Sequence, residues 1–262
     1  MATRESHLND QTGKSAARTN VKPVRGWFYE HPHTLMLTVI VAIFLARPIF
    51  GVGALSSAAF GIALLLLLLV ELYSLQIEAR QGSRVERNLR RNLRRFGLCL
   101  GIPALLGRFA SIVSDNQVLV MADLILWLTL TAFVTFTQVL ALVREKNITT
   151  DTISLSVSVY LLIGLTWTFI YGLICVFQPG AINLGPANPV TAHHVQRIFP
   201  VLGYFSLATL TTTGFGDIVP VTLPARFIAV FESIAGQFYL AIMVARLVGM
   251  QLSQGSAGGR EQ

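Results

Sequence analysis

The sequence predicts an all-α membrane protein with six transmembrane helices and one short re-entrant helix between the fifth and the sixth. Three observations predict this fold class. Apolar residues make up 53% of the 262 residues and charged residues only 13%, whereas about a quarter of a soluble domain is charged. Several apolar stretches approach the roughly 20 residues that cross a hydrocarbon core. Lysine and arginine also gather in alternate loops, as they do in membrane proteins.

The predicted spans should be helices, because a lipid-exposed backbone must satisfy its own hydrogen bonds. They cover residues 34–53, 55–77, 97–114, 117–143, 152–177 and 225–252. Arg47-Pro48 interrupts the first span, and the third is the weakest, since it is short and contains Pro103 and Arg108. These boundaries divide the chain into an N-terminal tail at 1–33, a four-helix domain at 34–146, a second domain at 147–252 and a short tail at 253–262.

The positive charges predict which side of the membrane each loop faces. With both termini in the cytoplasm, sixteen of the 20 Lys and Arg residues lie on the inner side, which is the bias expected of cytoplasmic loops. Omitting the weak third span would reverse the loops on one side of it and lose this bias, so we retain that span. The net charge of +7 therefore reflects topology and attraction to anionic lipid, and we expect no nucleic-acid partner.

The segment between the fifth and sixth spans carries the most informative motif. Residues 211–220 read Thr-Thr-Thr-Gly-Phe-Gly-Asp-Ile-Val-Pro. The preceding stretch, Pro200–Thr211, is apolar but too short to cross a membrane, and proline is favoured in a first helical turn. We therefore predict a re-entrant half-helix that begins at Pro200 and whose C-terminal end, with its partial negative charge, attracts a cation. Irregular backbone at membrane depth is tolerated only where it is buried in protein or lines a water-filled path.

The residue types of this motif suit a ring of backbone carbonyls that replaces the hydration shell of a cation. Gly214 and Gly216 supply backbone dihedral angles that are closed to residues with a Cβ. Thr212 adds a hydroxyl below the carbonyls, and Phe215 packs against the half-helix. Asp217 concentrates cations at the outer mouth. A single chain cannot close such a ring, so we expect four copies.

The motif resembles the signature of the tetrameric potassium-channel family. It departs from the common form at two places, with Thr213 where Val or Ile is usual and Phe215 where Tyr is usual. The resemblance covers about residues 152–252 and implies a homotetramer, K⁺ as the permeant ion, no cofactor, and a pore domain over the second half of the chain. It implies that K⁺ is coordinated in a selectivity filter by Thr212, Thr213, Gly214, Phe215 and Gly216.

The resemblance also implies roles for residues on the half-helix and on the last span. Tyr204 and Phe205 correspond to the aromatic cuff of the pore helix. Gly236 falls at the hinge of the inner helix. The same register turns three side chains toward the cavity, namely Gln237, Leu240 and Val244. Ala208 stands where some members carry a carboxylate, so the buried acid pair of those members is missing here, which leaves filter stability and inactivation open.

Six spans with one pore loop also resemble the voltage-gated layout, which requires several arginines carried through the field. The span at 117–143 has none in its interior. An arginine run does occur after the second span, at Arg84–Arg95, but Glu86 and Asn88 lie within it and do not suit lipid. We predict a cytoplasmic amphipathic helix there, bound to anionic headgroups, and weak or absent voltage gating.

Polar residues inside the spans are functional hypotheses. Arg108 and Asp123 lie about equally far from the turn at 114–117, so we predict an ion pair, the alternative being that Arg108 snorkels to the outer interface. Glu71 and Gln138 are predicted to lie at the same depth in the membrane, near its inner side. Glu232 is predicted to hydrogen-bond behind the pore helix, the alternative being a charge that faces the cavity.

Several questions stay open at this stage. His193-His194 in the outer loop is either a solvated pair or a sensor of external pH. The alternatives to a potassium channel are a non-selective cation channel and, less consistent with a single re-entrant segment, a potassium transporter. No enzyme motif is present, and the composition suggests a bacterial inner membrane. The sequence does not indicate how the channel is gated. The gate could lie in the filter or at the stretch Val244–Val248, or gating could come from lipid and tension acting on the first four spans.

Overall fold

The computed structural model describes residues 32–50, 54–81, 84–113, 116–145, 148–185 and 195–258. The described helices are α2 (Pro32–Phe50), α3 (Ala54–Gln81), α4 (Arg84–Val113), α5 (Gln117–Arg144), α6 (Thr150–Phe177), α7 (Val195–Leu210) and α8 (Leu223–Gly258). Two short strands, β1 (Ile182–Asn183) and β2 (Val219–Pro220), pair antiparallel. All of these elements belong to one unit, Pro32–Gln262. Most of the predicted tail at 1–33 and the histidine pair at 193–194 lie outside the described residues.

Each predicted span overlaps one helix. Within the described residues, three helices are long and apolar enough to cross a membrane, namely Gln117–Arg144, Thr150–Phe177 and Leu223–Leu252. Shorter apolar stretches occupy His33–Leu45, Gly61–Ser74 and Ile198–Leu210. The structure is therefore consistent with an all-α membrane protein, while the count of six spans stays a prediction.

Two helices differ from the sequence prediction at their N-terminal ends. The arginine run and the third predicted span form one uninterrupted helix, α4, because Pro103 lies on its exposed side and removes only one backbone hydrogen bond. The half-helix α7 begins at Val195, so the prediction of a start at Pro200 was wrong. Pro200 is the sixth residue of α7, so it removes one backbone hydrogen bond within the first two turns of the helix, and the helix continues through it.

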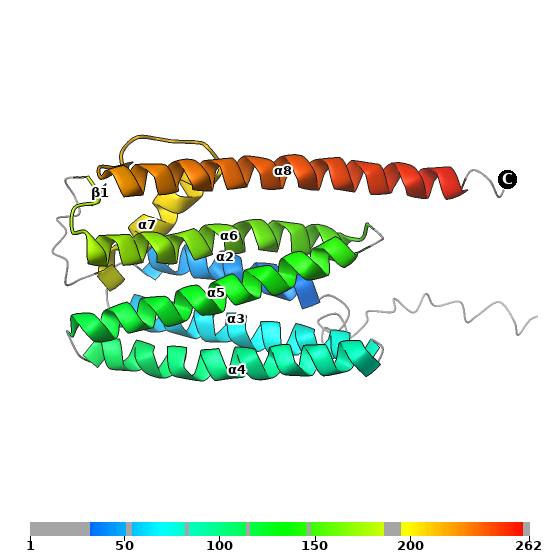
Figure 1. The fold of residues 1–262 in the computed structure, drawn as a ribbon, viewed down its shortest axis with the longest axis horizontal. Helices are drawn as coiled ribbons and strands as arrows, with labels where there is room; N and C mark the ends of the chain where they lie inside the picture. Colours follow the sequence, from blue (N-terminus) through cyan, green and yellow to red (C-terminus); the bar gives the residue numbers. More distant parts are fainter. Residues whose placement is uncertain are drawn as a thin grey trace, which may run out of the picture. The chain divides into compact units, whose positions relative to one another are not determined.

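Helix α6 connects the two halves of the fold. It contacts α2 and α5 on one side and α7 and α8 on the other. Helices α2, α3, α4 and α5 pack in sequence, each against the next. Figure 1 shows α7 lying between α6 and the long helix α8. The short helix and the loop that follows it are therefore held by the two helices that flank them in the sequence.

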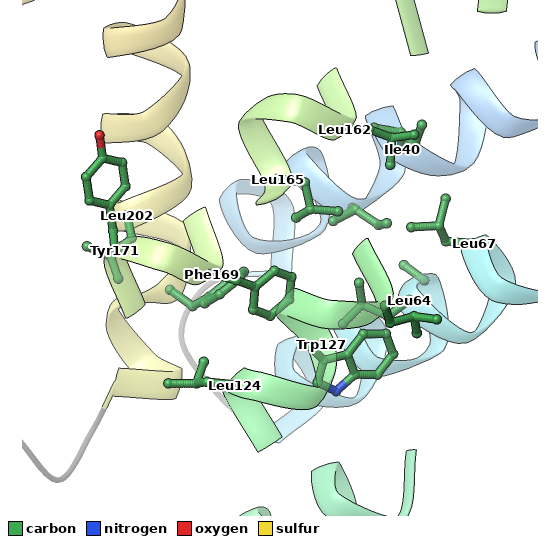
Figure 2. Packing of buried hydrophobic residues seen from close by; sticks show 14 of the residues in the cluster. Ile40, Leu64, Leu67, Leu124, Trp127, Leu162, Leu165, Phe169, Tyr171 and Leu202 are labelled. Atoms are coloured by element: carbon green, nitrogen blue, oxygen red, sulfur yellow. The ribbon is translucent and has the colours of Figure 1, made fainter. Parts of the chain in front are cut away.

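The apolar core runs from the four-helix part through α6 to α7. In Figure 2, Trp127 of α5 and Phe169 of α6 lie together with Leu64 of α3. The two aromatic rings stack with centroids 6.4 Å apart. Helix α8 is different, because only 17% of its apolar window is buried, against 56% for α6. Its apolar surface is left for lipid or for other copies of the chain.

Candidate functional site

The loop between α7 and β2, Thr211–Asp217, has an unusual backbone; we call it the Thr-Gly loop. Its φ angle is +56° at Thr212, +57° at Gly214 and +79° at Gly216. Glycine adopts positive φ readily, but for a β-branched residue it is a genuine outlier. Positive φ thus recurs at every second residue, and this alternation prevents the peptide groups from pointing to opposite sides in turn, as they do in a strand.

The N–H groups of the Thr-Gly loop are bound to the end of α7. The N–H of Thr212 donates to the carbonyl of Thr209 at 2.9 Å, and the N–H groups of Thr213 and Gly214 both donate to the carbonyl of Ala208, at 2.9 and 3.2 Å. Among the described residues, no hydrogen bond ends on the carbonyl oxygens of residues 212–215. The donors of this segment are thus used and its acceptors are left for another group.

The neighbouring long helices complete the end of α7. The carbonyl of Leu210 accepts a hydrogen bond from the Tyr160 hydroxyl of α6 at 3.1 Å. The carbonyl of Thr209 accepts one from Ser233 of α8 at 3.1 Å. Since the last carbonyls of a helix have no intrahelical partner, these contacts satisfy them and fix the point from which the Thr-Gly loop starts.

The C-terminal end of the loop is held by Tyr204. Its ring stacks on that of Phe215, with centroids 6.0 Å apart and an interplanar angle of 8°. Its hydroxyl donates to Oδ2 of Asp217 at 3.0 Å. Phe205 points elsewhere within the chain, since it is buried and meets the Tyr171 ring of α6 edge to face at 4.9 Å. Of the two predicted cuff residues, only Tyr204 touches the loop of its own chain.

The N-terminal end of the loop meets α8. The side-chain amide of Gln237 donates to the hydroxyl of Thr212 at 3.0 Å. Leu240 and Val244, the other residues predicted to face the cavity, are both exposed in the single chain. At Gly236 an added Cβ would lie 2.1 Å from the carbonyl oxygen of Leu210. Close packing of α8 against α7 thus accounts for this glycine, and α8 continues unbroken through it, so a hinge there stays a prediction.

A small sheet ties the far side of the loop to α6. Ile182 of β1 pairs with Pro220 of β2, and the N–H of Val221 donates to the carbonyl of Ala181 at 2.8 Å. Both ends of the Thr-Gly loop are therefore anchored to the same long helix or to the chain directly after it.

The four-helix part contains two buried polar contacts. Nη1 of Arg108 lies 3.3 Å from Oδ2 of Asp123, and both side chains are buried. Glu71 of α3 accepts hydrogen bonds from Thr137 at 2.7 Å and from Gln138. The structure thus brings together both pairs that the sequence matched by depth. The side chains of Arg84, Arg87 and Arg90 lie outside the described part, whereas Arg91, Arg94 and Arg95 are exposed.

Sequence reasoning missed three residues that support the site. Tyr160 and Tyr171 both reach toward α7 or α8, and their separation of eleven residues, close to three helical turns, was a readable signal that they share a face of α6. Arg246 of α8 donates to the carbonyls of Leu142 and Val143 and of Glu145 at the end of α5. No sequence pattern indicated that contact, because more than a hundred residues separate the partners.

The chemistry available at the loop is that of neutral oxygen ligands. Among the described residues, no group of three or more His, Cys, Asp or Glu side chains is placed to hold a metal ion. The loop instead offers backbone carbonyls and threonine hydroxyls, the ligands that can replace the water around an alkali cation.

Comparison with known proteins gives one match. Residues 199–252, which include most of α7, the Thr-Gly loop and α8 to Leu252, match a family described as ion channel. No curated protein and no solved structure matches the chain. Together with the long apolar helices, this match supports an integral membrane protein in which residues 199–252 are similar to an ion-channel domain.

Proposed function

We propose that this ion channel is selective for potassium and that its selectivity filter is the segment Thr212–Gly216. One observation carries the proposal. The N–H groups of Thr212, Thr213 and Gly214 are bound to the end of α7, while the carbonyls of residues 212–215 have no donor among the described residues. A row of unused carbonyls in a membrane protein needs a partner, and a dehydrated K⁺ provides one.

Four copies of the chain complete the coordination. One chain offers a single row of carbonyls, whereas replacing a hydration shell requires oxygens from all sides. Four copies of Asp217 at the outer mouth would raise the local concentration of cations. The exposed apolar residues of α8, such as Phe227, Phe231 and Phe238, provide surface for contact between copies. Native mass spectrometry should find a species of about four times 28.6 kDa, and a monomer in every lipid and detergent would contradict the assembly.

The proposed topology places both termini in the cytoplasm and Asp217 at the outer face. It follows from the lysine and arginine bias and leaves the exposed Arg91, Arg94 and Arg95 facing anionic headgroups of the inner leaflet. K⁺ is the transported ion, and the proposal includes no cofactor and no catalytic step.

Recording from purified protein in a planar bilayer tests the selectivity. With K⁺ alone, the reversal potential should move by about 59 mV for each tenfold change in the gradient, the value for one charge per ion. With K⁺ on one side and Na⁺ on the other, the reversal potential should lie close to the value expected for a membrane permeable to K⁺ alone. A reversal potential near zero in that mixture would identify a non-selective cation channel. Flux without resolvable unitary currents would identify a transporter.

A further inference from the structure

A buried carboxyl group lies behind the proposed pore helix. Glu232 of α8 has no exposed surface. Its Oε2 accepts a hydrogen bond from the Tyr171 hydroxyl of α6 at 2.5 Å. Its Oε1 lies 2.5 Å from Oγ of Ser206 on α7. The carboxyl group therefore joins α6, α7 and α8, the three helices that surround the Thr-Gly loop.

No described side chain forms an ion pair with Glu232. The ion pairs formed by described side chains join Arg108 to Asp123 and His33 to Asp151, and neither involves Glu232. A buried carboxylate without a cation is strongly disfavoured, and an acid inside a membrane protein faces the same penalty. A neutral carboxylic acid avoids it.

The hydrogen atoms of the cluster also fit a neutral acid. Ser206 has one hydroxyl hydrogen, but its Oγ lies 2.8 Å from the carbonyl of Gly164 as well as 2.5 Å from Glu232. If Glu232 carries a proton, Tyr171 donates to Glu232, Glu232 donates to Ser206, and Ser206 donates to Gly164. Each hydrogen then has one acceptor. If Glu232 is ionised, the Ser206 hydroxyl must donate to Glu232 instead of to the Gly164 carbonyl. Thr168 is then the one described side chain that still donates to that carbonyl.

We propose that Glu232 is a neutral acid that positions the selectivity filter by fastening Ser206 of α7 to both α6 and α8. Ser206 lies one turn before Leu210, the last residue of α7. The adjacent Ser233 donates a hydrogen bond to the carbonyl of Thr209. Two consecutive residues of α8 are therefore hydrogen-bonded to the end of α7 that binds the N–H groups of the proposed filter. Glu232 touches no permeating ion, and its filter-positioning role depends on the proposed function.

Glu232→Gln and Glu232→Ala separate the two parts of this proposal. Glutamine is neutral and of similar shape, so its amide can donate to Ser206 while its carbonyl accepts from Tyr171. We expect Glu232→Gln to keep the K⁺/Na⁺ permeability ratio within twofold of the wild type. Glu232→Ala breaks the connection and should lower that ratio at least tenfold. Tyr171→Phe and Ser206→Ala, which remove one connection each, provide the same measurement if Glu232→Ala does not assemble.

Infrared spectroscopy tests the protonation state independently of conduction. The tetramer should show a carboxylic-acid carbonyl band that disappears in Glu232→Gln. Glu71→Gln is the control, because Glu71 is, among the described side chains, the other buried glutamate that is hydrogen-bonded within the helices, and it should leave the Glu232 band in place. Absence of that band, or a Glu232→Gln channel as unselective as Glu232→Ala, would overturn the proposal. A wild-type channel that does not select K⁺ would refute the proposed function alone, because the infrared result stands without it.

Discussion

Single residues set the backbone of the proposed filter. Thr212 has a positive φ although its side chain is β-branched, a conformation that costs roughly 1–2 kcal/mol and persists only where the surroundings impose it. Here the N–H bond to Thr209 and the amide of Gln237 hold it on both sides. Such strain beside carbonyls that have no donor among the described residues is what a pre-formed coordination site would require, because an ion would then meet oxygens that need no rearrangement.

Gly216→Ala tests the loop at its outer end. Gly216 has φ +79° and no atoms near an added Cβ, so the change introduces backbone strain without a clash. We expect the chain to relieve roughly 1–2 kcal/mol by turning the neighbouring carbonyl, which abolishes potassium current and leaves the tetramer intact. Gly180→Ala is the matched control, since Gly180 has φ +84° and equally open space but lies outside the loop. Potassium selectivity retained in Gly216→Ala would count against the filter assignment.

The buried pair Arg108–Asp123 gives a prediction on stability. Removing one partner breaks this buried ion pair, and breaking a buried pair typically costs about 3–5 kcal/mol. Asp123→Ala should therefore lower the melting temperature of the solubilised protein. Replacing both residues together with apolar ones, Arg108→Met with Asp123→Leu, should recover most of the loss, because a well-packed apolar pair removes both desolvation costs. A single variant as stable as the wild type would show that the pair contributes nothing.

At the scale of elements, the sequence predicted which helices exist better than where they start. Long apolar stretches such as 117–143 and 152–177 match α5 and α6 within two residues at each end, because their length and composition leave one solution in a membrane. The start of α7 was wrong because Pro200 was treated as a helix boundary, and the two helices predicted at 84–95 and 97–114 form one helix, α4. Pro103 and Pro200 each remove one hydrogen bond, and tertiary packing outweighs that local cost.

The site, like the helices, could be predicted from the sequence only in part. The Thr-Gly loop and the depth-matched polar pairs could be read from residue type and spacing. The supports of the loop could be read only in part. The sequence predicted that Glu232 hydrogen-bonds behind the predicted pore helix, but its partners Ser206 and Tyr171 and the bond from Ser233 to Thr209 depend on how α8 lies against α7. Periodicity tells which residues share a face of a helix, but not which helix that face meets.

Gly236 tests the contact between α7 and α8. Alanine there would place a Cβ 2.1 Å from the Leu210 carbonyl oxygen, and a backbone atom cannot move aside as a side chain can. We expect Gly236→Ala to push the two helices apart, break the Gln237–Thr212 and Ser233–Thr209 hydrogen bonds and reduce tetramer yield or current. Gly249→Ala on the same helix has open space around it and should behave like the wild type. Equal behaviour of the two variants would show that the close contact is unimportant.

Arg246 joins α8 to the end of α5. Its guanidinium donates to three carbonyls, with Nη2 at 2.9 Å from that of Val143 and at 2.6 Å from that of Glu145. A cation at a helix C-terminus also interacts favourably with the helix dipole. Arg246→Ala should cost about 1.5–3 kcal/mol, the contribution of a hydrogen bond to a charged group, and speed amide exchange in the last turn of α5. Arg144→Ala removes an exposed arginine at the same helix end and should have little effect on either measurement.

At the scale of the whole molecule, we expect the four-helix part to sense voltage weakly, because the described side chains of α3 and α5 offer little net charge within the helices. Between its ends α5 carries one charged residue, Asp123, which is paired with Arg108, and Glu71 of α3 is held by Thr137 and Gln138. Moving one elementary charge across the membrane is worth about 2.3 kcal/mol per 100 mV. A paired aspartate and arginine move no net charge, so rearrangement of these helices gains little from the field.

We therefore expect a shallow conductance–voltage curve, with an effective gating charge near or below one per subunit, in symmetrical K⁺. Measuring the slope in bilayers of purified protein decides this. Asp123→Asn should steepen the curve if the helices move at all, because it leaves Arg108 as a net charge within the field. A steep wild-type curve would mean that charges outside the described side chains, such as those of Arg84, Arg87 and Arg90, cross the field. The four-helix part would then move with voltage, and the contact of Arg246 with α5 would be the route by which that movement reaches α8.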